Sequence, residues 1–174
     1  MINPDAEQVL EDLLRNDLDV VFCGTQAGAV SAQRHAYYAG PGNRFWTILH
    51  ESALVPSVLV PHEYRKLLDF RIGLTDVAKC TFGPDAILRR RHFRIDDFRR
   101  KIADYAPRVV AFNGKKAASA ALGIPSRRLG YGLQAVRIGR SSVFVLPSTS
   151  GAARAYWSAG PWMALSSHLG RMPA

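Results

Sequence analysis

The feature that most constrains the fold is an apolar run that ends abruptly in a loop bracketed by glycines. The run Leu18 to Cys23 is followed directly by Gly24-Thr25-Gln26-Ala27-Gly28. A short apolar run that stops at glycine is typical of a buried β-strand. Open α/β sheets bind ligands beyond the carboxyl ends of their strands. We therefore expect a strand at 18–23 and a functional loop from Thr25 to Gly42.

The rest of the chain alternates helix-like and strand-like segments. Apolar periodicity and capping residues predict helices over 5–15, 43–49, 61–68, 95–105 and 115–122 and after Pro161, and strands over 72–77, 109–112, 133–138 and 142–146. This alternation favours an α/β fold, a three-layer α/β/α sandwich around a central, mostly parallel four-stranded sheet. With 174 residues and no linker or repeat, we expect one domain over residues 1–174.

Charge and composition limit the classes of molecule that this chain is expected to bind. The net charge of +9 favours a polyanionic partner, nucleic acid before membrane; the alternative is a basic protein from a GC-rich genome. No apolar run approaches the roughly 18 residues that span a bilayer, and no basic–apolar leader pattern begins the chain. We expect a cytoplasmic protein, nucleoid-associated in a bacterium. Two cysteines are too few for an all-cysteine iron–sulfur cluster, and we expect no metal or cofactor.

Four of the predicted strands end in polar or small residues. Gln26, Asp76, Asn113 and Ser148 each lie at or just after such an end. Each alone is more often a turn or capping residue. In a parallel sheet, however, the carboxyl ends converge on one edge. The pattern therefore predicts one pocket lined by all four side chains.

Four segments carry a resemblance to a known family: Val20–Gly28, Pro41–Trp46, Phe112–Lys115 and Val145–Ser148. They resemble the uracil-DNA glycosylase superfamily, and most closely its mismatch-specific uracil and thymine-DNA glycosylase branch. That branch carries G-x-N-P-G, P-[AG]-N-[RH]-F-W, in some members F-N-G-K, and a P-S-rich second motif. The resemblance runs from about residue 18 to the last helix.

The resemblance implies roles for individual residues. Tyr38 would stack on a base flipped out of DNA, and Asn113 would read the uracil edge, because an amide offers a donor and an acceptor together. The other base-binding candidates at the first strand end are Phe22, Gly24 and Thr25. The implied DNA contacts come from the second and third segments and the second motif: Asn43, Arg44, Lys115, Ser148, Ser150, Gly151, Ala152 and Arg154.

The first motif departs from the family pattern at its catalytic position. Gln26 stands where relatives have a water-orienting Asn or Asp, and Ala27 replaces the usual proline. One extra methylene moves the amide away from an in-line water. The water-positioning residue therefore stays open among Gln26, Asp76, His35 and Ser31. In the second motif, Ala152 and Ala153 are small where relatives present a larger wedge, so Arg154 is expected to fill the gap left by the base.

These observations predict a monofunctional uracil-DNA glycosylase that flips uracil, and other deaminated bases, out of DNA and hydrolyses the N-glycosidic bond to leave an abasic site. The expected partner is uracil-containing or mismatched duplex, with single strands left open, and the expected state is a monomer. The alternative is a catalytically weak module that binds damaged or abasic DNA. A third interpretation, an unrelated nucleotide enzyme, is disfavoured because the Gly24–Gly28 loop lacks a Walker lysine and a G-x-G-x-x-G pattern.

Overall fold

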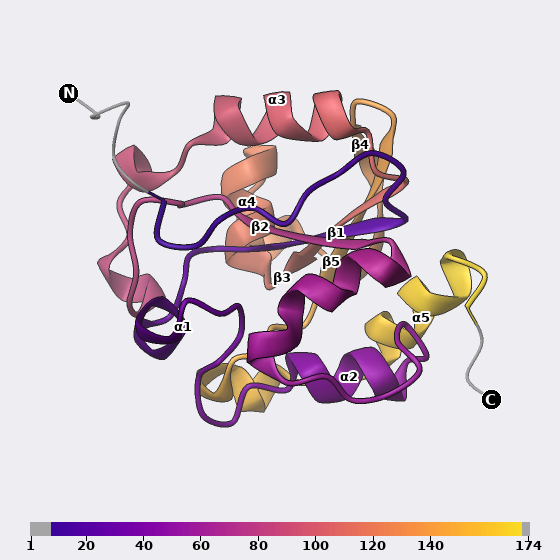
Figure 1. The fold of residues 1–174 in the computed structure, drawn as a ribbon. Helices are drawn as coiled ribbons and strands as arrows, with labels where there is room; N and C mark the ends of the chain where they lie inside the picture. Colours follow the sequence, from indigo (N-terminus) through magenta and orange to yellow (C-terminus); the bar gives the residue numbers. More distant parts are fainter. Residues whose placement is uncertain (1–7, 172–174) are drawn as a thin grey trace.

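A five-stranded sheet runs through the middle of the molecule in a computed structural model, which describes residues 8–171 (Figure 1). The strands are β1 (Val20–Gly24), β2 (Ile72–Asp76), β3 (Val109–Asn113), β4 (Gly132–Ile138) and β5 (Ser141–Leu146). Their order is β2-β1-β3-β5-β4. Strands β2, β1, β3 and β5 are parallel to one another, and β4 is antiparallel to β5. The sheet therefore has the expected parallel strands and a fifth, antiparallel strand at its edge.

Helices cover both faces of this sheet, which confirms the three-layer sandwich. Side chains on one face pack against α2 (Phe45–Glu51), α5 (Gly160–His168) and the 3-10 helix η1 (Pro61–Phe70). The other face packs against α3 (Ile95–Tyr105) and α4 (Lys115–Leu122), which lie on the opposite side of the sheet (Figure 1). All residues of β1, β2 and β3 are buried, as continuous apolar strands require.

The helices follow from local sequence. In α3, Phe98 and Ile102 are four residues apart and both are buried, so one face of the helix meets the sheet. The last residue of α4 is followed by Gly123 at a φ of 70°, a left-handed conformation that glycine adopts without strain. The loop after β1 is not structureless, because it contains the short helix α1 (Ala29–Arg34).

The predicted helix at 5–15 is wrong where the structure describes it. Residues 8–15 are not helical, while residues 5–7 lie outside the described part. Leu13 instead exchanges two backbone hydrogen bonds with Leu74, at 2.9 and 3.0 Å. The segment lies beside β2, the edge strand of the sheet, whose backbone groups would otherwise remain unpaired. Tertiary pairing has outweighed the helical spacing of its leucines.

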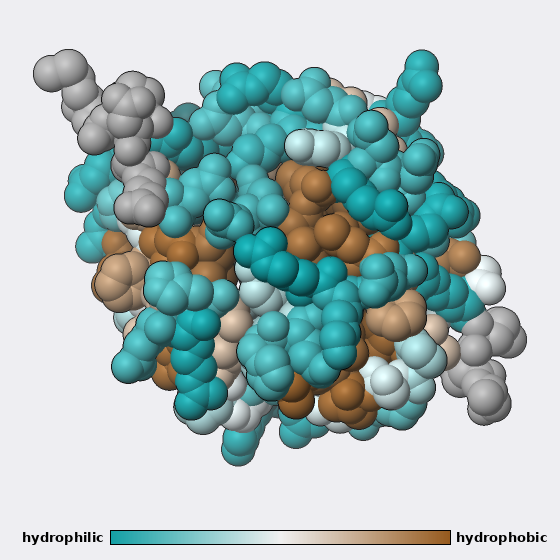
Figure 2. Space-filling view, viewed as in Figure 1, coloured by the Kyte–Doolittle hydropathy of each residue, from teal (hydrophilic) through white to brown (hydrophobic). Residues whose placement is uncertain are grey.

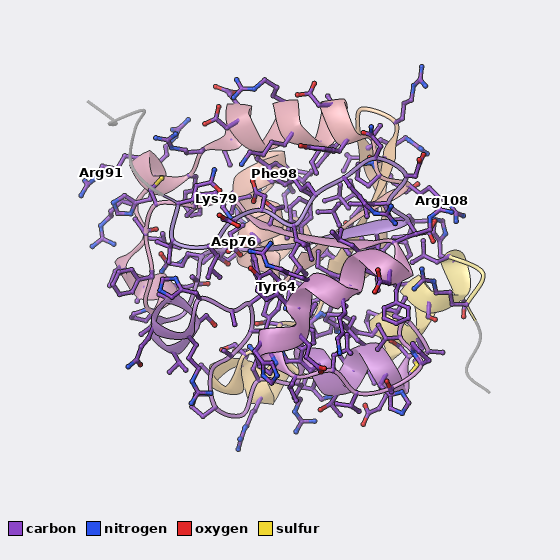
Figure 3. The ribbon with its side chains drawn as sticks, in the orientation of Figure 1. Tyr64, Asp76, Lys79, Arg91, Phe98 and Arg108 are labelled. Atoms are coloured by element: carbon purple, nitrogen blue, oxygen red, sulfur yellow. The ribbon has the colours of Figure 1, made fainter. Side chains whose placement is uncertain are left out.

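The two edges of the sheet have different chemistry. At the amino edge, Asp19 forms ion pairs with Arg71, Arg108 and Arg171 at 3.4, 3.2 and 3.1 Å. Arg108 lies far from Asp76 in the view of Figure 3. At the carboxyl edge, β1, β2 and β3 end at Gly24, Asp76 and Asn113, and the long loops gather there. This second edge can therefore form a site.

The face of the molecule shown in Figure 2 is mostly hydrophilic, with hydrophobic patches between the hydrophilic residues. Within the described residues, none of the helices combines the length and the apolar character needed to cross a bilayer.

Candidate active site

A cavity of about 490 Å³ opens at the carboxyl edge of the sheet. Its lining comes mainly from the loops that follow four strands: residues 24–28 with Ser31, 37–38, 40–41 and Asn43; Asp76 with residues 83–85; residues 113–116; and residues 148–153 with Tyr156. The four residues predicted from the strand ends, Gln26, Asp76, Asn113 and Ser148, all line it. The parallel topology thus brings them to one place, as the sequence indicated.

Asp76 is the buried carboxylate of this cavity. It ends β2, is only 6% exposed, and lies beside the last residue of β1, because Gly24 and Asp76 are partners in the parallel register. Burial raises its pKa to about 6; Lys79 opposes the shift, whereas Asp12 and Asp85 add to it. No hydrogen bond to this carboxylate is found among residues 8–171. A carboxylate with these properties can accept a proton near neutral pH.

A charged network lies behind Asp76. Lys79 is 5% exposed and contacts the Asp12 carboxylate at 2.9 Å, and it donates a hydrogen bond of 2.9 Å to the Tyr37 hydroxyl. Lys101 forms a second ion pair with Asp12. Burial raises the pKa of Asp12, but Lys79 and Lys101 outweigh it and hold that pKa below its usual value. Asp76 and Lys79 lie close together in Figure 3.

Gln26 lines the cavity, but its amide is engaged by a neighbouring loop. Its Nε2 donates to the carbonyl oxygens of Gly83 and Pro84 at 3.0 and 3.1 Å. Its Oε1 accepts a hydrogen bond of 2.8 Å from the Thr81 hydroxyl. Both Nε2 protons and one Oε1 lone pair are therefore used. In this arrangement Gln26 fastens the loop 81–84 to the end of β1.

Asn113 is also bonded to a loop, on the other side of the cavity. Its Nδ2 donates to the Thr149 hydroxyl at 2.8 Å, and its Oδ1 accepts from the Thr149 backbone N–H at 2.9 Å. One N–H and one lone pair of the amide remain. Asn113 is 7% exposed and lines the cavity, so these remaining groups are the ones that can meet a ligand.

Tyr38 and Gly24 form the wall between these two sides. The Tyr38 ring is stacked on Phe45, with centroids 3.9 Å apart, and its φ of 54° is unusual for a residue other than glycine. Burial and then Asp76 raise the pKa of the Tyr38 hydroxyl well above its ordinary value, so it is protonated at neutral pH. A Cβ on Gly24 would lie 2.4 Å from Asp76 Oδ1 and 3.5 Å from this hydroxyl. Only glycine leaves room for both groups.

Two of the other candidates, Phe22 and His35, do not line the cavity, whereas Ser31 does. Phe22 is fully buried and packs against Phe45 and Trp162, because alternate residues of β1 face the α2–α5 layer. It therefore does not line the cavity. His35 is exposed and lines a neighbouring hollow instead. Ser31 lines the cavity, but its hydroxyl already accepts a hydrogen bond of 3.0 Å from the Ala39 N–H. Gly24 and Thr25 line it as expected.

Most of the predicted DNA-contacting residues surround the cavity mouth: Asn43, Lys115, Ser148, Ser150, Gly151 and Ala152 all line it. The two arginines do not. Arg44 and Arg154 line a separate hollow of about 330 Å³ beside Trp157, and the Arg44 guanidinium lies 5.3 Å from the centroid of that ring. Arg154 Nη2 would lie 3.0 Å from a Cβ on Gly42. Arg154 is exposed, on the outer side of its loop.

Four functional candidates were missed from the sequence. Thr149 and Thr81 fasten the two amides, and Lys79 lies behind Asp76, but hydroxyls and a lysine in short loops carry no signal of such partners. Tyr156 lines the cavity and is 73% exposed. An aromatic residue ten positions after a strand, in a loop without periodicity, could have been noticed.

Comparison with known proteins agrees with this geometry. The sequence model of the uracil DNA glycosylase superfamily matches residues 12–166. The fold resembles an NMR structure of a provisionally named uracil DNA glycosylase from Methanosarcina acetivorans, with a TM-score of 0.67 and 23% sequence identity. That match covers 92% of this chain and 96% of the other. The extent of the family match, with the sandwich and the cavity at its carboxyl edge, places this chain in the uracil DNA glycosylase superfamily.

Proposed function

We propose that the protein removes uracil from DNA by hydrolysis of the N-glycosidic bond, with Asp76 as the residue that activates water. The observation that carries this proposal is a buried carboxylate with a pKa of about 6 in a cavity at the carboxyl edge. Family membership supplies the reaction class, a DNA glycosylase. The cavity volume is within the usual range for a small-molecule site, about 300–1,000 Å³.

In the proposed step, Asp76 accepts a proton from a water molecule as the water oxygen bonds to C1′ of the deoxyribose. The C1′–N1 bond breaks, and its electron pair leaves with uracil as the N1 anion. The sugar passes through a state with oxocarbenium character, which a nearby carboxylate stabilises by its charge. A proton-accepting group near neutral pH contributes about 10²- to 10⁴-fold to such a rate.

Asn113 and Tyr38 would hold the base. The free N–H and lone pair of Asn113 match one acceptor and one donor on the uracil edge. The Tyr38 ring lines the cavity while Phe45 supports it at 3.9 Å. Stacking on an aromatic ring contributes about 1–3 kcal/mol per base, which offsets much of the few kcal/mol that flipping costs. A mispaired uracil flips at least cost, so a G·U pair is the favoured duplex substrate.

Gln26 would act as a positioning residue. Its three hydrogen bonds hold residues 81–84, and that loop forms one side of the cavity mouth. The departure from the family pattern at this position is then accommodated by the carboxylate on the neighbouring strand. Gln26, one of the four residues left open for positioning the water, would then shape the cavity instead.

The test is release of uracil from oligonucleotides that contain a single G·U pair, followed by alkaline cleavage at the abasic site. Excision is expected under single-turnover conditions and in EDTA. Asp76→Asn should abolish most of it, and Asp85→Asn, at another acidic residue of the cavity lining, should not. Absence of release at high enzyme concentration, with retained binding to abasic DNA, would instead establish the damage-binding alternative.

A further inference from the structure

Two exposed tyrosines are connected with the cavity: Tyr156 lines it, and Tyr131 contacts Lys115, which also lines it. Tyr156 is 73% exposed and Tyr131 is 39% exposed. Single exposed aromatic residues are normal on a protein surface. These two differ because Tyr156 lines a cavity and Tyr131 contacts a cation.

The topology explains why two segments distant in sequence meet there. Tyr131 immediately precedes β4, and Gly132, the first residue of β4, pairs with Val145 near the carboxyl end of β5. Tyr156 is the last residue of the 3-10 helix η5 (Gly151–Tyr156), which follows the end of β5. Partial burial and then Tyr156 raise the pKa of Tyr131.

A lysine completes the group. Lys115 Nζ lies 4.6 Å from the centroid of the Tyr131 ring, at a distance typical of a cation–π contact. Both Lys115 and Tyr156 line the cavity. No ring contact is found for Tyr156 among residues 8–171, so a face of this ring is open to a ligand.

We propose that Tyr131, Lys115 and Tyr156 form a stacking site for an unpaired nucleotide next to the one in the cavity, and that this site favours uracil in single-stranded DNA. The proposal rests on the proposed function for the identity of the ligand. Aromatic side chains stack on any base through its π-face, without sequence preference. A lysine beside them can neutralise the connecting phosphate, in a chain whose net charge is +9.

Duplex and single-stranded DNA differ at this site because the bases next to the flipped nucleotide are paired only in the duplex. In a duplex, the bases that flank a flipped nucleotide remain paired and stacked on their neighbours, so they are not available to protein rings. In a single strand, a flanking base is free to unstack and bind. The contribution of the tyrosines is therefore larger for single strands than for duplex.

The experiment compares Tyr156→Ala and Tyr131→Ala with Tyr156→Phe and with the control Tyr105→Ala. Tyr105 ends α3 near the amino edge of the sheet, before β3 begins. The first readout is the fluorescence of 2-aminopurine in a single-stranded oligonucleotide without uracil, which needs no catalysis. The second is the single-turnover rate of uracil excision from single-stranded and from G·U duplex oligonucleotides.

We expect Tyr156→Ala to weaken the binding of the 2-aminopurine strand by about 5- to 100-fold, the effect of losing one base–aromatic stack. Tyr156→Ala should also lower the single-turnover rate of uracil excision more on single strands than on duplex, by a similar factor. Tyr156→Phe should retain binding, and Tyr105→Ala should match the wild type.

Equal losses on the two substrates, or unchanged binding of the 2-aminopurine strand, would overturn the stacking site. A different result separates this proposal from the enzymatic one. If the wild type releases no uracil but binding still depends on Tyr156, the glycosylase proposal fails and the stacking site stands.

Discussion

The two sides of the cavity differ in the surroundings of one polar residue on each side, Asp76 and Asn113. On the β1–β2 side, Asp76 is buried without a described hydrogen bond, and its pKa is raised to about 6. On the β3–β5 side, Asn113 is bonded twice to Thr149. The first side holds a group in an unfavourable environment, and the second holds a group in a fixed geometry. Reactivity is expected where a charge is poorly solvated, and recognition where an amide cannot turn.

The comparison predicts its largest effect at Asp76. Asp76→Asn should lower the single-turnover rate of uracil excision by about 10²- to 10⁴-fold, because the proton acceptor is lost. The same change should stabilise the fold. Since the folded-state pKa is raised from 3.8 to about 6, the native state binds more protons than the unfolded state between these values, and stability falls as pH rises through them.

Removal of that charge should increase the free energy of unfolding above pH 6 by as much as about 3 kcal/mol, at 1.36 kcal/mol per pKa unit. Thermal unfolding at about pH 8 and at about pH 4 measures it, with a gain expected only at the higher pH. A variant that loses activity and stability together would show that Asp76 is a structural residue.

The second effect is expected on the recognition side. Asn113→Ala leaves the Thr149 N–H without its partner, at a cost of about 1–3 kcal/mol, and should slow excision by about 10- to 100-fold. Thr149→Val is the matched control, because it removes only the hydroxyl partner and keeps the amide in place. If both variants lose activity equally, Asn113 acts through the loop and does not read the base.

The third effect is a shift in the pH profile. Excision should rise with pH as Asp76 ionises, with half of the maximal rate near pH 6. Lys79 favours the charged form, so Lys79→Met should move this midpoint upward and reduce the rate several-fold at pH 6, with a smaller loss at higher pH. Lys101→Met also removes a partner of Asp12 and should leave the midpoint in place. An identical shift in both variants would exclude a direct effect of Lys79 on Asp76.

The smallest effect is expected at Gln26. Gln26→Ala removes the three hydrogen bonds to residues 81–84 but no reacting group. The lost free energy, about 0.5–1.5 kcal/mol per bond, then destabilises the loop and not the transition state, so excision should fall by less than about tenfold. Hydrogen exchange at residues 81–85 should increase. Thr81→Val, which removes one of these bonds, should give an intermediate exchange rate. A loss as large as that of Asp76→Asn would return the catalytic role to Gln26.

Much of the fold could be predicted because its elements depend on local patterns. The run Val109–Phe112 reads as a buried strand, and the spacing of Phe98 and Ile102 reads as a helix; both predictions are confirmed. The helix at 5–15 was wrong because Leu13 pairs with β2, and no local pattern reveals an open sheet edge.

The sequence predicted which strand-end residues meet in the site, but it did not predict their hydrogen-bond partners. The four end residues meet because parallel strands place their carboxyl ends together. The sequence could not show that Gln26 and Asn113 are each fastened to a loop, since Thr81 and Thr149 lie 55 and 36 residues away. Nor could the sequence select a water-positioning residue among Gln26, Asp76, His35 and Ser31. The raised pKa of Asp76 depends on its burial, which a sequence does not show.

The register that sets Gly24 beside Asp76 also bears on how such enzymes change during evolution. One point in the cavity can be reached from the end of either of two adjacent strands. A carboxylate can therefore occupy this point from the end of β2 only while position 24 is glycine, because a Cβ there would lie 2.4 Å from Asp76 Oδ1. Positions 24 and 76 are therefore expected to vary together, with glycine retained at 24 wherever 76 carries a carboxylate.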